Sequence, residues 1–370
     1  MARAKRLMVI SHPAVVTVNQ EVYREMLAVG DWEIEIIVPK YWRHSYAPGR
    51  VEPQVLEGME GNLRRVPVAF AGRQQRHFYL ARCGLLCARF DPDVAFIEAE
   101  PFSLSAIQWS RVFAKRGVPF GVQFAENIDR QMPAVLKRLR TRVLQQASFV
   151  AARSETAASL ARDWGAVGSV AMAPHAVPGW DAVAPPDGDR PFTVGYAGRL
   201  VESKGLLDLL AAVRLLDAPV ELVLIGEGEL RPALEGQSIP GSEVRVIDDL
   251  SHAEMPSGYA QLDVVALPSR TTPSWEEQFG RVVVEALWCG VPVVGSDSGE
   301  IPWLIGKTGG GLVFPEGDIT ALAQRLEELR LDPQRRRDLA AVGRQTVEDL
   351  FSVPAATAAL ERLVAEASTR

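Results

Sequence analysis

The segment 192–226, FTVGYAGRLVESKGLLDLLAAVRLLDAPVELVLIG, gives the clearest indication of the fold of this chain. Its ends, 192–198 and 220–226, are apolar runs without polar alternation, which is typical of strands buried on both faces. Between them, 206–216 has the apolar spacing of a helix. Buried strands joined by a helix predict a parallel sheet that is covered on both faces. A strand that ends in Gly also predicts a ligand crevice beyond the carboxyl ends of the strands.

The same alternation extends in both directions. In the second half it predicts strands at 243–248, 263–269 and 291–297, with a helix at 281–289. The first half repeats the pattern less cleanly, with two basic amphipathic helices expected at 72–90 and 132–147. We therefore predict an α/β protein made of two Rossmann-like, doubly wound domains. The strands expected in the first half are 6–11, 32–39, 62–68, 93–100, 119–126 and 148–154.

The length of 370 residues exceeds what one hydrophobic core usually serves. The stretch 174–191 is rich in Pro, Gly and Asp and is expected to be a hinge. We predict an N-terminal domain at 1–180 and a C-terminal domain at 181–351. A final helix at about 352–370 can pack on either domain, including back on the first.

The composition is that of a soluble globular protein, with 47% hydrophobic and 23% charged residues. The net charge of −6 argues against a general nucleic-acid binder. The charge is uneven, however: residues 1–180 carry 23 Lys+Arg and 16 Asp+Glu, whereas residues 181–370 carry 17 and 30. The two halves are therefore expected to meet different partners.

Nothing in the sequence predicts a targeting or membrane-spanning segment. The opening MARAKRLMVISHPAVV reads as a buried strand, since LMVI is too short for a signal-peptide core. Cys83, Cys87 and Cys289 lack disulfide or zinc spacing and are expected to be buried small hydrophobes. We expect a cytoplasmic protein.

Two motifs of the second half carry chemistry. In GYAGRLVESKG (195–205), Arg199 and Lys204 lie between a strand end and a helix start, where cations, backbone amides and the helix dipole suit a pyrophosphate. In WEEQFGRVVVEALWCGVPVVGSDSG (275–299), Glu277 precedes a helix and Glu285 lies within it. Glu285 is surrounded by apolar residues, so it needs a partner, and a carboxylate suits the two hydroxyls of a ribose or sugar.

Together these motifs resemble the retaining nucleotide-sugar glycosyltransferases of family 4, the glycosyl transferases group 1, which have the GT-B fold. GRLVESKG (198–205), LIGEGEL (224–230), LPS (267–269) and 276–305 follow the order and spacing of that family. Weaker matches in the first half are EAEPF (98–102), QFAENIDRQMP (123–133), RSETAASLARDWGA (153–166) and APHAVPG (173–179). The resemblance implies that the two domains face each other across a cleft.

The resemblance also assigns roles. It places Arg199 and Lys204 on the donor diphosphate, Glu277 on the donor-sugar hydroxyls and Glu285 on the ribose diol. It implies retention by front-face attack without a protein nucleophile and without a metal or cofactor, using a UDP- or GDP-linked sugar. The other donor-side residues that it implies are Gly198, Gly226, Glu227, Gly228, Asp249, Phe279, Gly280, Arg281 and Val282.

The function expected is transfer of a sugar to an acceptor hydroxyl in bacterial glycan, glycolipid or polysaccharide synthesis. Two alternatives have the same fold: a nucleotide-sugar epimerase, and a phosphorylase, which would need a pyridoxal-binding Lys. A third is a non-enzymatic two-lobed binding protein, which would not need a diphosphate clamp.

The departures from the family lie on the acceptor side. The loop after the first strand, 11–26, has no paired glycines, and it contains His12, which is expected to face the cleft. Glu126 and Asn127 occupy the segment in which relatives often carry a His. We take these three residues as acceptor-side candidates. The acceptor is expected to be a glycan or a lipid-linked molecule.

Basic side chains are concentrated in 72–90 and 132–147, the latter with Lys137, Arg138, Arg140 and Arg142. Basic amphipathic helices can lie on anionic membranes. Peripheral contact with the inner face of a membrane is therefore one interpretation, and a solvated face or a basic wall for an anionic acceptor is the other.

Overall fold

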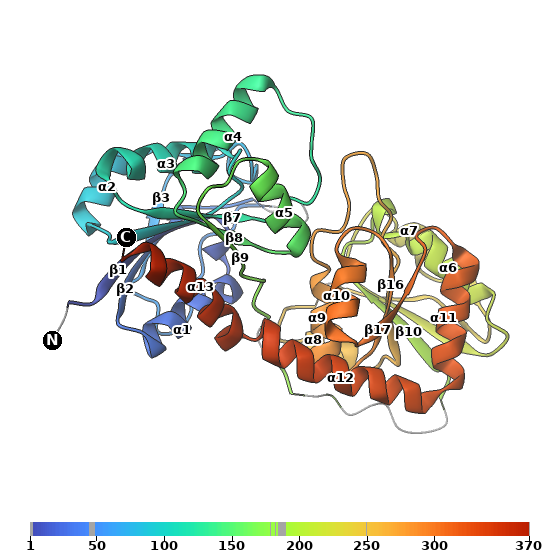
Figure 1. Cartoon of the computed structure of the whole chain (residues 1–370). Helices are drawn as coiled ribbons and strands as arrows, with labels where there is room; N and C mark the ends of the chain where they lie inside the picture. Colours follow the sequence, from blue (N-terminus) through green and yellow to red (C-terminus); the bar gives the residue numbers. More distant parts are fainter. Residues whose placement is uncertain are drawn as a thin grey trace. The chain divides into compact units, whose positions relative to one another are not determined.

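The computed structural model describes residues 3–43, 49–177, 179–181, 183, 190–248 and 250–369. The chain divides into two compact units (Figure 1). Met1–Pro178 and Val353–Arg370 form the N-terminal unit, and Gly179–Ser352 forms the C-terminal unit. The domain boundary expected at 180/181 differs from the observed one by two residues.

The described residues of the N-terminal unit form a seven-stranded parallel sheet in the order β3-β2-β1-β6-β7-β8-β9. A short antiparallel pair, β4–β5, lies outside it. The strands are β1 (Lys5–Ser11), β2 (Trp32–Pro39), β3 (Leu63–Val66), β4 (Val68–Ala69), β5 (Phe78–Tyr79), β6 (Val94–Glu98), β7 (Phe120–Phe124), β8 (Phe149–Ala152) and β9 (Ser169–Met172). The helices are α1 (Glu21–Val29), α2 (Cys83–Phe90), α3 (Leu104–Arg116), α4 (Ala134–Gln146), α5 (Glu155–Asp163) and α13 (Val353–Ala367), with 3₁₀ turns η1 (Pro13–Val15) and η2 (Thr17–Asn19).

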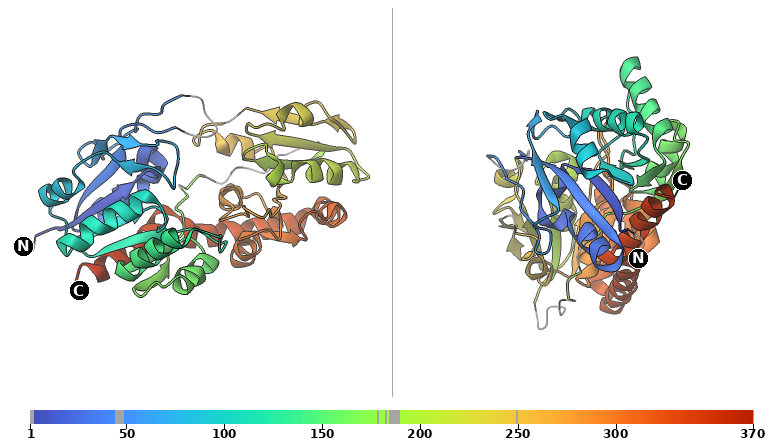
Figure 2. Two further views of the ribbon diagram at one scale, coloured as in Figure 1. Left: turned by 90° about the horizontal axis from the view of Figure 1, so that it is seen from above. Right: turned by 90° about the vertical axis from the view of Figure 1, so that its left-hand side faces the viewer.

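Both faces of this sheet are buried, as its continuous apolar strands predict. Along β1, Met8 and Ile10 enter one core, while Leu7 and Val9 enter the other. The second core is completed by Leu360 and other residues of α13, which packs on α1, β6 and β8. The last helix therefore belongs to the N-terminal unit although the chain reaches it through the C-terminal unit, and both chain ends lie in the same unit (Figure 2).

The helix expected at 72–90 is wrong in its first half, because only Cys83–Phe90 is helical. The preceding residues run through β5, which pairs with β4. Gln108 of α3 also binds this strand, accepting from the Tyr79 amide at 2.9 Å and donating to the Tyr79 carbonyl at 2.9 Å. A tertiary partner thus holds backbone groups that a helix would have used, which local pattern cannot reveal.

The described residues of the C-terminal unit form a six-stranded parallel sheet in the order β14-β11-β10-β15-β16-β17, with β12–β13 as a separate pair. The strands are β10 (Phe192–Ala197), β11 (Val220–Ile225), β12 (Ser238–Ile239), β13 (Ser242–Glu243), β14 (Arg245–Ile247), β15 (Val264–Leu267), β16 (Val293–Ser296) and β17 (Gly311–Phe314). The helices are η3 (Glu202–Lys204), α6 (Leu206–Arg214), α7 (Arg231–Leu234), α8 (Met255–Tyr259), α9 (Arg281–Trp288), α10 (Ile301–Thr308), α11 (Ile319–Leu331) and α12 (Pro333–Phe351).

In the two large parallel sheets, the strands that were not expected from the sequence are β9 and β17. Each is at an edge of its sheet and is mostly half-buried rather than fully buried. An edge strand needs fewer apolar residues, so its pattern is weak.

Among the described helices, none is both long enough and apolar enough to cross a membrane. The three cysteines are free and buried, which confirms the expectation that they act as small hydrophobes.

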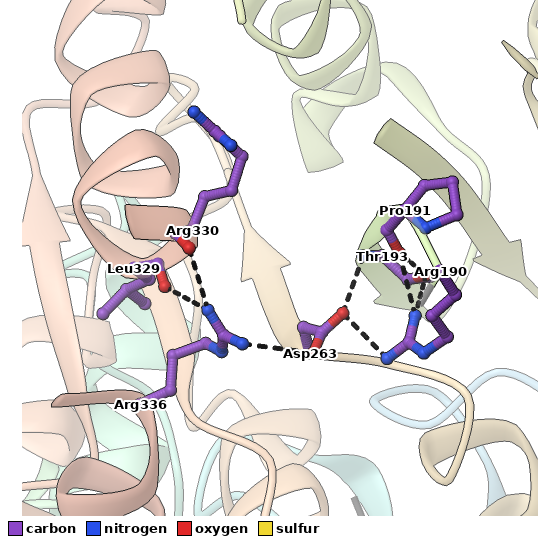
Figure 3. Close-up of polar contacts among 7 residues, drawn as sticks. All are labelled: Arg190, Pro191, Thr193, Asp263, Leu329, Arg330 and Arg336. Atoms are coloured by element: carbon purple, nitrogen blue, oxygen red, sulfur yellow. Dashed lines mark hydrogen bonds and ion pairs between the residues drawn. The ribbon is translucent and has the colours of Figure 1, made fainter. Parts of the chain in front are cut away.

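Asp263, just before β15, joins four segments of the C-terminal unit at the edge where strands begin (Figure 3). It accepts hydrogen bonds from Arg190 Nη2 at 2.8 Å and from the Thr193 amide at 2.9 Å. Arg336 of α12 lies 3.6 Å from its other oxygen and donates to the Leu329 carbonyl of α11 at 2.5 Å. Asp263 therefore links the sheet to α12, and Arg336 extends this link to α11.

We expect Asp263→Ala to lower the free energy of unfolding by about 2 kcal/mol, because it leaves two largely buried guanidinium groups without their carboxylate. Asp263→Asn should lose less, since the amide oxygen still accepts from Thr193. Urea denaturation measures both values. Equal stability of Asp263→Ala and the wild type would contradict this role.

Candidate functional site

The predicted donor-side residues of the C-terminal unit gather where its parallel strands end. The turns after β10 and β11 pack closely, with the Leu200 amide donating to the Glu227 carbonyl at 2.8 Å. Gly226 has φ 132°, and a Cβ there would lie 2.2 Å from the Gly198 carbonyl oxygen. Only glycine fits this position, so two glycine-containing turns form one surface at the carboxyl edge of the sheet.

Lys204 and Glu277, which are far apart in sequence, form an ion pair. Lys204 lies in η3, before α6, and its Nζ is 2.5 Å from Glu277 Oε2. Ser269, just after β15, donates from its hydroxyl to the same Oε2 at 3.1 Å. The two charged side chains are 13% and 12% exposed. The structure thus brings together two of the three residues predicted to be catalytic.

Backbone contacts fix the approach to α9. The Glu300 amide donates to the Glu277 carbonyl at 2.9 Å, and a Cβ on Gly299 would lie 2.2 Å from that same oxygen. Phe279 is buried, with its ring centroid 5.8 Å from that of Phe351. Gly280, at φ 72°, is the N-cap of α9. The predicted loop residues therefore lie in a constrained turn, followed by Arg281 and half-buried Val282 in the first turn of the helix.

Glu285 occupies the second turn of α9 and is largely buried. Its Oε1 is 2.8 Å from Arg281 Nε, and its Oε2 accepts a hydrogen bond from the Tyr259 hydroxyl at 3.1 Å. Burial raises the pKa of Glu285, and the nearby Arg281 opposes this. Sequence reasoning missed Tyr259, because a Tyr at the end of a short helix gives no signal of this contact.

Arg199 and Glu227 lie on exposed parts of the same edge. The Arg199 carbonyl accepts from the Tyr196 hydroxyl at 2.9 Å, and its guanidinium makes no hydrogen bond or ion pair with the described residues. Glu227 pairs with Arg231, which also lies 2.6 Å from Asp248. Arg231 was not predicted, and it links the turn after β11 to the end of β14. Predicted Asp249 lies outside the described residues.

In the N-terminal unit, His12 directly follows β1 and lies against aromatic rings. Its ring centroid is 5.0 Å from those of both Trp42 and His77. Burial and the adjacent His77 lower the pKa of His12 to about 3. His12 is therefore neutral at physiological pH and can act there as a hydrogen-bonding or stacking group rather than as a cation.

The other two acceptor-side candidates, Glu126 and Asn127, follow β7 and are buried. Glu126 Oε2 accepts from Arg130 Nε at 2.6 Å, which makes an ion pair within the loop. Glu126 Oε1 accepts from the Ile128 amide at 3.3 Å. These contacts hold the loop after β7 at the carboxyl edge of the sheet, the edge at which β1 also ends.

Sequence reasoning missed a buried polar cluster behind this edge. Glu98, the last residue of β6, accepts from the Ser11 hydroxyl at 2.5 Å and lies 3.5 Å from Arg153. Burial raises the pKa of Glu98, while Arg153 lowers it. Arg153 also donates to the Ala173 carbonyl at 2.7 Å, where the chain leaves the unit. The available signal was a Glu that ends the apolar run VAFIE.

The chain is similar to known proteins in sequence and in fold. Residues 183–346 match the family described as glycosyl transferases group 1. A GDP-mannose-dependent monoacylated alpha-(1-6)-phosphatidylinositol monomannoside mannosyltransferase from Corynebacterium glutamicum is 33% identical over 170 residues, which are 44% of each chain. The match therefore spans less than half the length of that relative.

Two solved structures are similar over nearly the whole chain. Sucrose-phosphate synthase from Thermosynechococcus elongatus covers 98% of both chains at 18% identity, with a TM-score of 0.73. Anabaena HepE in complex with UDP covers 98% of this chain and 100% of its own at 16% identity, with a TM-score of 0.74. At such identities the likeness shows a shared fold, the GT-B fold expected from the sequence.

Glu100, two residues after β6, is an acid whose burial makes the stability of the folded state depend on pH. Its Oε1 accepts from the Ala125 amide at 2.8 Å, and its buried Oε2 has no hydrogen-bond partner among the described residues. Burial, and secondarily Glu126, raise the pKa of Glu100 to about 8. A carboxyl whose pKa is raised on folding stabilises the folded state below its unfolded pKa, and this stabilisation is lost as the pH rises towards 8.

We therefore expect ionisation of Glu100 to lower the free energy of unfolding of the wild type by roughly 2–4 kcal/mol between pH 5 and pH 8.5. Glu100→Gln, which stays neutral, should flatten that fall. Urea denaturation across the range measures it, with Glu57→Gln as the control because Glu57 is exposed. The same slope in Glu100→Gln and the wild type would rule this origin out.

Proposed function

We propose that the chain is a retaining glycosyltransferase, because residues 183–346 match the family described as glycosyl transferases group 1. It moves a sugar from a nucleoside-diphosphate sugar, linked to UDP or GDP, to an acceptor hydroxyl. The acceptor is a glycan or a lipid-linked molecule of bacterial glycan, glycolipid or polysaccharide synthesis. The supporting relative acts on a phosphatidylinositol mannoside, and one structural neighbour holds UDP.

The observation that carries the proposal is the meeting of Lys204 and Glu277 at the carboxyl edge of a parallel sheet, 2.5 Å apart. A cation suits the diphosphate, and a carboxylate suits the sugar hydroxyls next to it. Glu285 adds a second carboxylate along α9 for the ribose diol. In this assignment, Glu285, Lys204 and Glu277 correspond to the ribose, the diphosphate and the sugar of the donor.

In the proposed mechanism, the chain's own residues stabilise charge rather than form covalent bonds. Negative charge develops on the diphosphate as the glycosidic bond breaks, and Arg199 and Lys204 stabilise it. Glu277 positions the sugar so that the acceptor hydroxyl attacks the face from which the diphosphate leaves, and the hydroxyl proton passes to the leaving diphosphate oxygen. Because two side-chain cations supply the positive charge, we propose that no divalent metal is required and that activity survives chelation.

The acceptor side is assigned to the N-terminal unit. His12, Glu126 and Asn127 lie at the ends of β1 and β7 and offer neutral, acidic and amide groups for hydroxyls. The basic surplus of the first half favours an anionic acceptor, such as a lipid phosphate.

Anionic membrane contact is proposed through two helix faces of the N-terminal unit. On α4, Val135, Arg138 and Arg142 are exposed at helical spacing. Arg140, which the sequence grouped with them, is buried, with its Cζ 3.6 Å from the centroid of the Trp164 ring. At α2, exposed Arg82, Leu85 and Arg89 repeat the spacing. Basic side chains beside an exposed apolar one suit a headgroup surface.

A donor assay tests the reaction. Incubation with UDP- and GDP-sugars should release UDP or GDP and should release more when acceptors such as lipid-linked glycans are added. The product should keep the anomeric configuration of the donor, as NMR of the product can establish. Interconversion of the sugar without nucleotide release would favour an epimerase, and binding without turnover would favour a binding protein.

Two variants separate the proposed carboxylate roles. Glu285→Ala should weaken UDP or GDP binding by about 10- to 100-fold, because it removes a charged partner of the ribose. Glu277→Ala should lower turnover at least tenfold with little loss of nucleotide affinity, because Lys204 is then left to the diphosphate. Calorimetry and initial rates measure both, with exposed Glu243→Ala as the control. Equal effects of both variants on affinity would refute this division.

The membrane proposal predicts that the full chain floats with anionic phosphatidylglycerol vesicles at low salt. Charge reversal at Arg138 and Arg142 should reduce the bound fraction several-fold, since each basic residue near the surface contributes about 1 kcal/mol. The control is vesicles of neutral phosphatidylcholine. If the wild type fails to float with anionic vesicles, membrane contact is excluded.

A further inference from the structure

The loop between β15 and α9 places an aromatic ring against Lys204. Lys204 Nζ lies 4.6 Å from the centroid of the Trp275 ring, over its face. This is the same Nζ that pairs with Glu277. A cation at this distance over an indole face is attracted by the ring quadrupole. Trp275 thus belongs to the surroundings of the proposed donor cation, a role that no sequence motif indicated.

Trp275 is held by a tight turn. The Thr272 amide donates to the Trp275 carbonyl at 2.7 Å, and the Thr272 hydroxyl donates to the same oxygen at 3.2 Å. The Trp275 amide returns a bond to the Thr272 carbonyl at 3.3 Å. The start of the loop is fixed by Thr271, whose amide donates to Glu316 at 2.7 Å. The ring therefore rests on an ordered backbone rather than on a free loop.

The two partners of Lys204 differ in one chemical respect. Glu277 neutralises the ammonium, so a diphosphate that approaches Lys204 must compete with it. Trp275 attracts the ammonium but leaves its full charge and its N–H donors available. A ring on one side can therefore hold Nζ in place while the anion on the other side is exchanged.

We propose that Trp275 is a positioning residue. It holds the Lys204 ammonium in place for the donor diphosphate when Glu277 leaves Lys204 and binds the sugar hydroxyls. The inference rests on the proposed function and deepens it. It explains why the loop carries an indole beside a lysine that already has a carboxylate. It assigns Trp275 to binding of the diphosphate, and not of the nucleoside or the acceptor.

The test measures binding of UDP and GDP, and of uridine and guanosine, to the full chain by calorimetry. Trp275→Ala should weaken diphosphate binding by about 3- to 30-fold, the range of a partly desolvated cation–π contact. Nucleoside affinity should not change. Trp275→Phe should recover part of the loss because it restores an aromatic face. The control is Leu331→Ala, which truncates an exposed apolar side chain of the same unit.

A double-mutant cycle separates positioning from a structural role. In the Lys204→Ala background, Trp275→Ala should cause no further loss of diphosphate affinity, whereas a ring that merely supports the loop would cost affinity in both backgrounds. If Lys204→Ala weakens binding but Trp275→Ala does not, the inference is wrong and the proposed function stands. If the wild type binds neither nucleotide, the proposed function itself is wrong.

Discussion

Parallel pairing of buried strands governs how this chain is organised. A parallel pair needs a crossover connection, and its two apolar faces must both be covered, so helices lie on each side of both sheets. The same constraint directs every strand of a sheet to end at one edge. Residues that follow β10, β11 and β15 therefore meet although long stretches of sequence separate them. The candidate donor site is a consequence of the sheet's direction.

The positive charge at this edge of the sheet comes from a few side chains and not from the net charge of the C-terminal half. The second half of the chain has 17 Lys+Arg and 30 Asp+Glu, a balance that repels a nucleotide at a distance. The proposed site works against that balance through Lys204 and exposed Arg199. The acid Glu277 neutralises Lys204 in this structure, while Trp275 contacts the ammonium without neutralising it. Lys204 thus has two neighbours of different charge, which makes exchange of Glu277 for an anionic ligand possible.

Several strands could be predicted from sequence because their pattern lies within a short stretch of the chain. The runs that form β1, β2, β10 and β11 are continuous and apolar, and burial on both faces requires that composition. Edge strands β9 and β17 are weaker in pattern because one side faces no neighbouring strand. The error at 72–82 arose because Gln108, on another helix, binds the backbone of β5. Such a partner has no trace in the local periodicity.

The candidate site also has features that the sequence predicts and features that only the folded chain shows. The fold class, the family resemblance and the residue types at the donor edge follow from sequence alone, since Lys204, Glu277 and Glu285 lie in motifs whose order and spacing can be compared directly. The pairings became visible in the folded chain: Lys204 with Glu277 and Trp275, Glu285 with Tyr259, and Glu98 with Ser11 and Arg153. The folded chain also shows that Arg140 is buried and that α13 completes the N-terminal core. The physical reason is that spacing specifies position along one element, whereas pairing and burial depend on which elements the chain packs together.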